Sequence, residues 1–232
     1  MTTLTGKVAL ITGPKGGLGS AVTHAFLAAG ATVAGVSRAI TNHDFSHPKF
    51  RAIQGELSSS EESRKAVETA LTQEGRIDIL VHLVGAFAGG DPVVGTEDAI
   101  LDNMIDVNLR STFYVAKAVL PHMRSRKSGR IVAVGSRAAV EASPGAAAYS
   151  ASKAAVVALI RAIAAENAAD GISANVVLPG TMDTPANRKA MPQADVTKWV
   201  KTEQVAQLIL TLASDDLTQI NGAAIPIYGC EL

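Results

Sequence analysis

Tyr149 and Lys153, four residues apart, carry the most reactive chemistry in the sequence. Residues at this spacing lie on one face of a helix, so the phenol and the ammonium group are expected to be neighbours. A tyrosine normally loses its proton at about pH 10. A nearby ammonium group favours the phenolate and brings the pKa of the phenol toward working pH. The pair therefore predicts a general acid–base centre.

Ser136 adds a hydroxyl group to this pair. It follows an apolar run at residues 130–134, which we expect to be a strand, with Gly135 between them. In open α/β sheets the carboxyl ends of the strands face the ligand crevice, so Ser136 is expected at the same site. Its hydroxyl group is then in a position to hydrogen-bond a substrate oxygen.

A glycine-rich turn at residues 12–19 predicts a dinucleotide site. The turn lies between an apolar strand and a helix, where glycine lets the backbone approach a pyrophosphate and the helix N-terminus favours anions. A flexible turn without a ligand is the alternative. The residues of this turn expected to contact the cofactor are Gly13, Lys15, Gly17, Leu18 and Gly19.

The residues after the second strand distinguish one dinucleotide from another. An acid there would bind the ribose hydroxyls of NAD, whereas this sequence has Ser37-Arg38, with the next acid at Asp44. Arg38 suits a 2′-phosphate, so NADP(H) is expected to be preferred and NAD(H) to remain usable. A solvated surface arginine is the alternative. Glu56 and Leu57, after the third strand, are expected near the adenosine, where Glu56 would add negative charge.

Alternating strands and helices must position these residues. Strands are expected at residues 8–11, 31–36, 50–54, 77–84, 130–134, 172–178 and 223–228. Helices are expected at residues 21–29, 58–73, 97–109, 112–125, 149–169 and 202–213. This βαβ repetition predicts a doubly wound α/β fold, a seven-stranded sheet that is mostly or wholly parallel, with helices on both faces. Residues 1–232 are expected to form a single domain that binds the dinucleotide and carries the catalytic site, without a separate substrate domain.

Taken together and in order, these motifs make the chain similar to the short-chain dehydrogenase/reductase family along essentially its whole length. Thr12-Gly13 with Gly17 and Gly19 matches the cofactor turn of that family. The nicotinamide-side loop is matched by Pro179-Gly180 and Thr184, with Met182 between them. The resemblance implies a Rossmann-type domain and a nicotinamide cofactor.

The same resemblance implies a catalytic set of Asn108, Ser136, Tyr149 and Lys153. Tyr149 would be the acid/base, and Lys153 would hold the nicotinamide ribose and lower the tyrosine pKa. Ser136 would orient the carbonyl, and Asn108 would support a water-linked proton relay. The expected function is therefore carbonyl reduction or alcohol oxidation by hydride transfer. A dinucleotide-binding regulatory protein without turnover is a weaker alternative, because a pure binder does not need the acid/base pair.

Two segments depart from that pattern. The family has Asn-Asn-Ala-Gly after the fourth strand, whereas this chain has His82-Leu83-Val84-Gly85. Gly85 still lets the backbone pass beneath the cofactor, and His82 is expected to be a satisfied core histidine. Residues 181–195 and Trp199 resemble dihydropteridine reductases, which gives a second enzyme hypothesis. That branch usually lacks the serine and prefers an acid after the second strand, unlike this chain. Trp199 would either cap a planar substrate or anchor its loop.

Composition narrows the class of partner. The sequence of 232 residues contains 21 basic and 21 acidic residues and only 4% aromatics, so neither nucleic acid nor an acidic membrane surface is expected. The one cysteine suits a reducing compartment, and neither a signal peptide, a membrane-spanning run nor a metal site is expected. These features predict a cytoplasmic enzyme with a small-molecule substrate. The apolar helix segment 154–160 and the family resemblance imply a homodimer or homotetramer.

Overall fold

The computed structural model describes residues 2–141 and 143–230. Within these residues, a seven-stranded sheet has the order β3-β2-β1-β4-β5-β6-β9, and every neighbouring pair is parallel. The strands are β1 (Val8–Thr12), β2 (Thr32–Ser37), β3 (Phe50–Gln54), β4 (Ile79–His82), β5 (Gly129–Val134), β6 (Ile172–Pro179) and β9 (Ala224–Ile227). The predicted doubly wound α/β sheet is confirmed.

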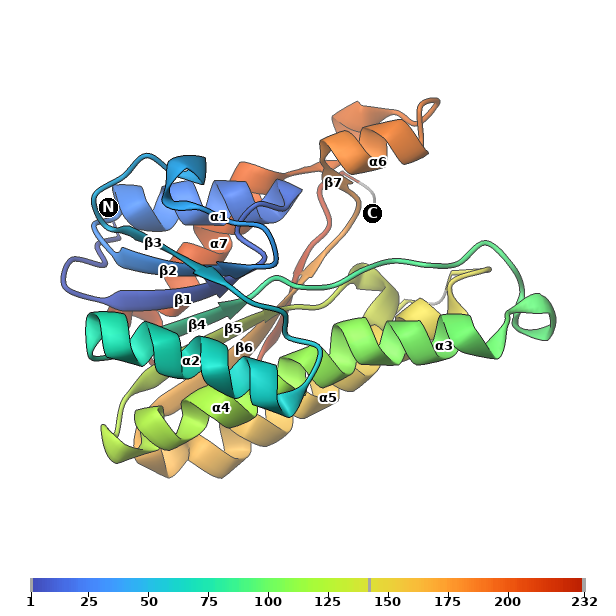
Figure 1. Ribbon diagram of the computed structural model, residues 1–232. Coiled ribbons are helices and arrows are strands. Elements are labelled where there is room, and N and C mark those ends of the chain that lie inside the picture. The colour runs from blue at the N-terminus through green and yellow to red at the C-terminus, as the bar shows by residue number, and fades with distance from the viewer. Residues whose placement is uncertain (1, 142, 231–232) are drawn as a thin grey trace.

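Helices cover both faces of this sheet (Figure 1). They are α1 (Gly17–Ala28), α2 (Ser60–Glu74), α3 (Asp98–Met104), α4 (Ser111–Ser125), α5 (Ala147–Asn167), α6 (Pro185–Ala190) and α7 (Thr202–Ala213). Helices α1 and α7 lie on one face, and α2, α4 and α5 lie on the other.

The strands are buried on both faces because successive side chains point to opposite sides. Ala9 and Ile11 belong to the apolar cluster that includes α1 and α7, whereas Leu10 belongs to the cluster with α2, α4 and α5. This explains why the strands read as continuous apolar runs rather than alternating ones.

Two predicted elements around the site have different bounds. The strand expected at residues 77–84 ends at His82, because the Leu83 N–H donates to the Thr12 side chain instead of a neighbouring strand. The helix expected at residues 97–109 is α3 followed by a π-helix over Ile105–Arg110. A π-helix carries one extra residue per turn, which a helical hydrophobic period does not reveal, and such segments are frequent at functional sites.

Helix α1 begins earlier than expected, at Gly17 rather than residue 21. Glycine has a low helix propensity, so the sequence placed the boundary too late. The segment between β6 and α7 also contains regular structure that was not predicted. A short parallel pair, β7 (Met182–Asp183) and β8 (Val200–Lys201), brackets α6.

Helix α5 is a long, apolar helix that carries part of the site. Residues 147–170 are long and apolar enough to cross a membrane by length and composition, so the expectation that no such run exists was wrong. In the structure, however, Val156, Ile160 and Ile163 of α5 pack in the buried cluster beneath the sheet. The apolar composition is that of a core helix.

Candidate active site

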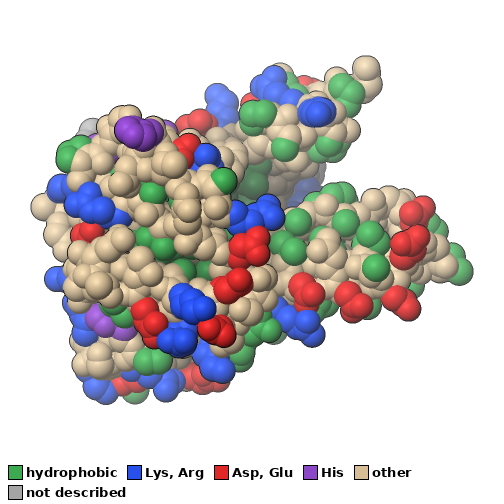
Figure 2. Space-filling view, viewed as in Figure 1, with side chains coloured by type: hydrophobic (Ala, Val, Ile, Leu, Met, Phe, Trp, Pro, Cys, Tyr) green, Lys and Arg blue, Asp and Glu red, His purple; other side chains and the backbone are tan. Residues whose placement is uncertain are grey.

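The predicted catalytic residues come together beyond the carboxyl ends of the central strands. Ser136 follows β5, Tyr149 and Lys153 lie in the first turns of α5, and Asn108 lies in the π-helix. The segments that leave β4 and β6 extend on this side of the sheet toward α3 and α6 (Figure 1). Between the projections that carry α3 and α6 the surface is hollowed, and hydrophobic side chains gather on the α3 side (Figure 2).

The Ser136 hydroxyl group lies close enough to the Tyr149 phenol to lower its pKa. Ser136 Oγ accepts the N–H of Ala138 at 3.1 Å, which leaves its own hydrogen available to donate to another acceptor. Burial raises the pKa of Tyr149, and the Ser136 side chain opposes part of that shift. The Phe87 ring stands edge-on to the Tyr149 ring, with centroids 5.0 Å apart.

Lys153 is almost completely buried, and its Nζ donates to the carbonyl of Val134 at 2.9 Å. Burial lowers the pKa of this ammonium group to about 8. We expected Lys153 to lower the tyrosine pKa, but the pKa of Tyr149 is raised. The physical reason is that the phenol is itself desolvated, while the ammonium group is hydrogen-bonded to a strand carbonyl.

The Asn108 side chain forms two hydrogen bonds with the backbone that follows β4. Its Oδ1 accepts the N–H of Ala86 at 2.9 Å, and its Nδ2 donates to the Ala86 carbonyl at 3.1 Å and to Ser152 Oγ at 2.9 Å. A Cβ on Gly85 would lie 2.9 Å from Asn108 Oδ1 and 3.0 Å from Lys153 Nζ. Only glycine therefore fits between the two predicted catalytic side chains at this point.

The glycine turn packs against the nicotinamide-side loop. A Cβ on Gly19 would lie 2.0 Å from the carbonyl oxygen of Gly13, and a Cβ on Gly17 would lie 2.7 Å from Thr184 Cγ2. Thr184 also caps α6, accepting the N–H of Asn187. The turn thus leaves the first backbone groups of α1 beside the loop that Pro179, Gly180 and Met182 lead into, an arrangement that can hold a pyrophosphate.

On the adenosine side, each predicted cation has an acidic partner. Lys15 Nζ lies 2.7 Å from Asp44 and donates to the Ala39 carbonyl at 3.0 Å. Arg38 lies 3.7 Å from Glu56, and its side chain is 81% exposed. Sequence reasoning missed the role of Asp44, although its reciprocal cap with Thr41, three residues earlier, was a local signal.

Ser37 is the last residue of β2, and its carbonyl accepts the N–H of Gly55 at 3.2 Å. Leu57 belongs to the buried apolar cluster, and its contact with the cofactor, which would be made by its backbone, stays a prediction. Its position between β3 and α2 requires an apolar anchor, which a sequence motif does not distinguish from a contact residue.

Three further residues, His82, Trp199 and Cys230, have clear environments in the structure. His82 is buried and hydrogen-bonded through both ring nitrogens, to Thr12 and to Ser111, so the expectation of a satisfied core histidine is met. Trp199 is 7% exposed and therefore anchors its loop. Cys230 is exposed, and its N–H donates to the Lys198 carbonyl at 3.2 Å.

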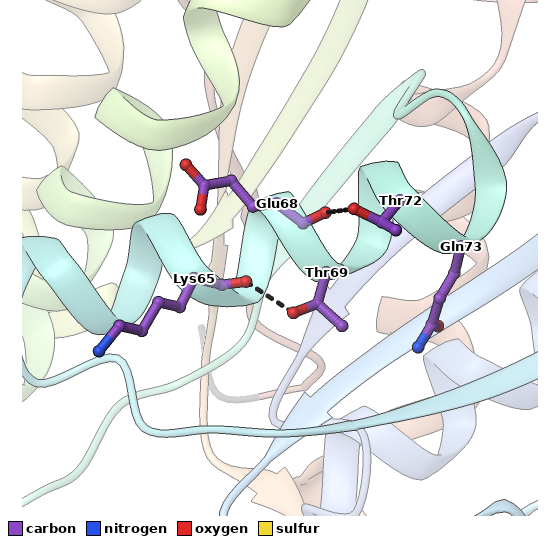
Figure 3. Close-up of a pocket in the computed structure, with 5 residues that line it drawn as sticks. All are labelled: Lys65, Glu68, Thr69, Thr72 and Gln73. Atoms are coloured by element: carbon purple, nitrogen blue, oxygen red, sulfur yellow. Dashed lines mark hydrogen bonds between the residues drawn. The ribbon is translucent and has the colours of Figure 1, made fainter.

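A separate hollow on the outer face of α2 has no connection with these residues. Lys65, Glu68, Thr69, Thr72 and Gln73 line it (Figure 3). The Thr69 and Thr72 hydroxyls donate to the Lys65 and Glu68 carbonyls within the same helix, so they are not directed at a ligand. The hollow is a surface depression of one helix.

Comparison with known proteins agrees with the geometry. A model of the short chain dehydrogenase family matches residues 7–209. A 3-oxoacyl-[acyl-carrier-protein] reductase of Thermotoga maritima is 33% identical over 249 residues, covering 97% of this chain and 98% of the relative. A 2-(R)-hydroxypropyl-CoM dehydrogenase of Xanthobacter autotrophicus is 31% identical over 243 residues, covering 96% and 97%. The solved structure of ElxO with NADP bound superimposes with a TM-score of 0.91 at 26% identity, covering 99% of this chain and 98% of that one.

Proposed function

The chain belongs to the short-chain dehydrogenase/reductase family and is an NAD(P)-dependent oxidoreductase. From this premise we propose that it is a carbonyl reductase that prefers NADP(H). The observation that carries the proposal is the placement of the Ser136 hydroxyl beside the Tyr149 phenol, with Lys153 one helical turn further along α5. A hydroxyl and a phenol that meet in this way can both donate to one carbonyl oxygen.

In the proposed reaction the nicotinamide, when bound, supplies a hydride to the carbonyl carbon. Tyr149 gives its phenolic proton to the carbonyl oxygen, and Ser136 hydrogen-bonds that oxygen as negative charge develops on it. Burial raises the pKa of Tyr149, so the phenol is protonated at neutral pH and has a proton to donate. Lys153 provides positive charge beside the phenolate that remains, and Asn108 supports the water-linked route that returns a proton to Tyr149.

Arg38 is the basis for the preference for NADP(H). Its planar fork suits a 2′-phosphate, and β2 ends without the carboxylate that would bind a bare ribose. The solved structure of ElxO with NADP bound supports the same choice. An exposed charged hydrogen bond of roughly 1–3 kcal/mol corresponds to about a 5- to 150-fold preference. Glu56, 3.7 Å from Arg38, moderates this preference by competing for the guanidinium group.

The substrate that fits best is an uncharged, apolar carbonyl compound. Phe87 packs against the Tyr149 ring and is 64% exposed, and Val140, close to Ser136 in the chain, is 57% exposed. Met191, at the end of α6, is also exposed. Exposed apolar side chains on both sides of an acid–base centre bind apolar groups by excluding water.

Trp199 separates this proposal from a dihydropteridine reductase. Trp199 is 7% exposed, so it is not presented as a stacking partner for a planar ring. A purely regulatory binder is disfavoured because it has no need of the acid/base pair that Tyr149 and Lys153 form on α5.

A substrate panel tests the proposal directly. NADPH oxidation is followed by absorbance with apolar ketones, 3-oxoacyl thioesters and quinonoid dihydropterin as acceptors, and NADPH binding is measured separately. We expect turnover with apolar ketones. Turnover restricted to the dihydropterin would establish the second enzyme hypothesis, and NADPH binding without turnover on any acceptor would make the protein a dinucleotide sensor.

The proposal extends to a homodimer or homotetramer in the cytoplasm. Phe113 of α4 and Leu101 of α3 are both more than two-fifths exposed, and such apolar surface favours association. A reduced, unpaired Cys230 suits a reducing compartment.

A further inference from the structure

A series of hydrogen bonds passes through the buried ring of His82 at the end of β4. The Leu83 N–H donates to Thr12 Oγ1 at 3.1 Å, and Thr12 Oγ1 lies 2.9 Å from His82 Nδ1. On the other side of the ring, His82 Nε2 lies 3.1 Å from Ser111 Oγ, and Ser111 Oγ donates to the Val107 carbonyl at 2.6 Å. Thr12, His82 and Ser111 are each at most 3% exposed, so water does not compete for these partners.

Only one arrangement of protons makes all four contacts of this series hydrogen bonds. A hydroxyl group has a single hydrogen, and Ser111 uses its hydrogen on the Val107 carbonyl. Ser111 Oγ therefore accepts from His82, which places a hydrogen on Nε2. The Nδ1 of a neutral ring is then an acceptor, and Thr12 donates to it while accepting the Leu83 N–H. Every hydrogen bond in the series runs in one direction, from β4 to the π-helix.

The two ends of the series lie at functional parts of the proposed site. Thr12 is the last residue of β1 and is followed directly by Gly13 of the cofactor turn. Val107 precedes Asn108 in the π-helix, and Ser111 begins α4 immediately after it. We propose that His82 is a positioning residue, whose neutral imidazole holds the π-helix, and with it Asn108, at a fixed place relative to the cofactor turn.

The environment of the ring keeps it neutral. Burial lowers the pKa of His82 to about 3, and the ammonium group of Lys153 lowers it further in the same direction. A neutral ring adds no positive charge beside Lys153, which must keep its own proton in the proposed reaction. The imidazole is also long enough to contact Thr12 of β1 with one nitrogen and Ser111 of α4 with the other.

Half-substitutions separate the two contacts of the ring. Asparagine places an amide oxygen where Nδ1 lies, so His82→Asn retains the partner of Thr12 but does not reach Ser111. Glutamine places its amide nitrogen where Nε2 lies, so His82→Gln retains the donor to Ser111. Because the proposal rests on the proposed function, turnover is measured as kcat for NADPH-dependent ketone reduction, alongside the Kd of NADPH.

We expect His82→Asn and Ser111→Ala to lower kcat by up to roughly 100-fold, because small displacements of a catalytic group reduce rates by that order. The Kd of NADPH is expected to be unchanged in both, and His82→Gln is expected to recover most of the rate. A residue that only stabilised the fold would not produce this division between kcat and Kd, nor recovery by glutamine.

His122 provides a matched control at the opposite end of the sheet. Its Nε2 accepts the N–H of Ile77 at 3.2 Å, far from the π-helix, so His122→Leu is expected to lower the melting temperature without changing kcat. Wild-type kcat in His82→Asn and Ser111→Ala would overturn the proposal. An equal loss of kcat in His122→Leu would also overturn it, because the effect would then be one of general stability.

Two measurements are independent of turnover. Nitrogen-15 NMR of the histidine rings at neutral pH should show His82 as the neutral Nε2–H tautomer, and an Nδ1–H tautomer or a charged ring would contradict the proposal. Amide hydrogen exchange at residues 105–111 should become faster in His82→Leu and stay unchanged in His122→Leu. If the wild type reduces no carbonyl compound, the proposed function fails, and these two measurements still decide whether His82 holds the π-helix.

Discussion

The pKa of the Tyr149 phenol depends on two opposing influences. Burial raises it, the neighbouring Ser136 side chain lowers it, and burial has the larger effect. The net result is a raised pKa and a protonated group that can act as an acid at neutral pH. Tyr149→Phe removes the proton donor and leaves the ring against Phe87. We expect kcat for ketone reduction to fall by about 10²–10⁴-fold, with the Kd of NADPH unchanged. Full turnover of this variant on the best wild-type substrate would remove Tyr149 from the mechanism.

The buried ammonium group of Lys153 is expected to lower the free energy of unfolding, because burial disfavours its charged form. Its pKa is about 8 in the folded chain, below the ordinary value of 10.5, so the unfolded chain binds more protons between these values. The free energy of unfolding should therefore rise with pH across this window. Lys153→Met should unfold at a higher temperature at neutral pH and lose this pH dependence, while ketone reduction is lost. Thermal melts of the wild type and of Lys153→Met from pH 7 to 10 measure the effect. The account would be contradicted if the melting temperature fell with rising pH in the wild type but not in Lys153→Met.

Arg38 tests cofactor choice through a single exposed side chain. Arg38→Ala should lower the ratio of kcat/KM for NADPH to that for NADH by about 5- to 150-fold at one fixed salt concentration. Arg64→Ala, which removes a comparably paired arginine from α2, is the control and should leave the ratio unchanged. An unchanged ratio in Arg38→Ala would mean that the 2′-phosphate is read elsewhere, with Lys15 released from Asp44 as the next residue to test.

At the scale of elements, the first turn of α1 packs tightly against the glycine turn that precedes it. A Cβ at residue 19 would lie 2.0 Å from the Gly13 carbonyl oxygen, which the backbone can relieve only by opening the turn. We expect Gly19→Ala to weaken NADPH binding by at least about tenfold, equivalent to roughly 1.4 kcal/mol. Gly95→Ala is the control, because the nearest atom to a Cβ there is 3.8 Å away. Fluorescence titration with NADPH measures both variants, and equal affinities would contradict this account of the turn.

The elements that the sequence predicted well are those whose signal is local. Short, mostly apolar runs marked the strands of the sheet, and the short connections between strands and helices implied parallel crossovers. The spacing of Tyr149 and Lys153 on one helix needed only the helical period.

The features that the sequence did not predict depend on residues far apart in the chain. The π-helix at residues 105–110 is linked to β4 through Ser111 of α4, which donates to the Val107 carbonyl and contacts His82, 29 positions away. The pairing of Lys15 with Asp44 depends on how the turn after β2 folds back, and the raised pKa of Tyr149 depends on burial by other segments. The β7–β8 pair was missed because strands of two residues have no period to detect.

At the scale of the whole molecule, association is the main untested prediction. Phe113 on α4 is 45% exposed, and an apolar helix surface of this kind favours burial against a second copy. Light scattering at micromolar concentration should give the mass of a dimer or tetramer, and Phe113→Glu should shift it toward the monomer. Val94→Glu, at a side chain that is 96% exposed on the loop before α3, should leave the mass unchanged. A monomeric wild type would contradict the prediction.

The exposed Cys230 gives the molecule a natural attachment point for a spectroscopic label. It is the single cysteine of the sequence, so a maleimide dye would react at one position without any mutation. Its backbone is hydrogen-bonded to Lys198, directly beside the β8 strand that closes the segment carrying α6. A dye at this thiol would therefore report, through its emission or anisotropy, on whether the α6 segment moves when NADPH or a ketone is added, and stopped-flow mixing would time that movement against hydride transfer.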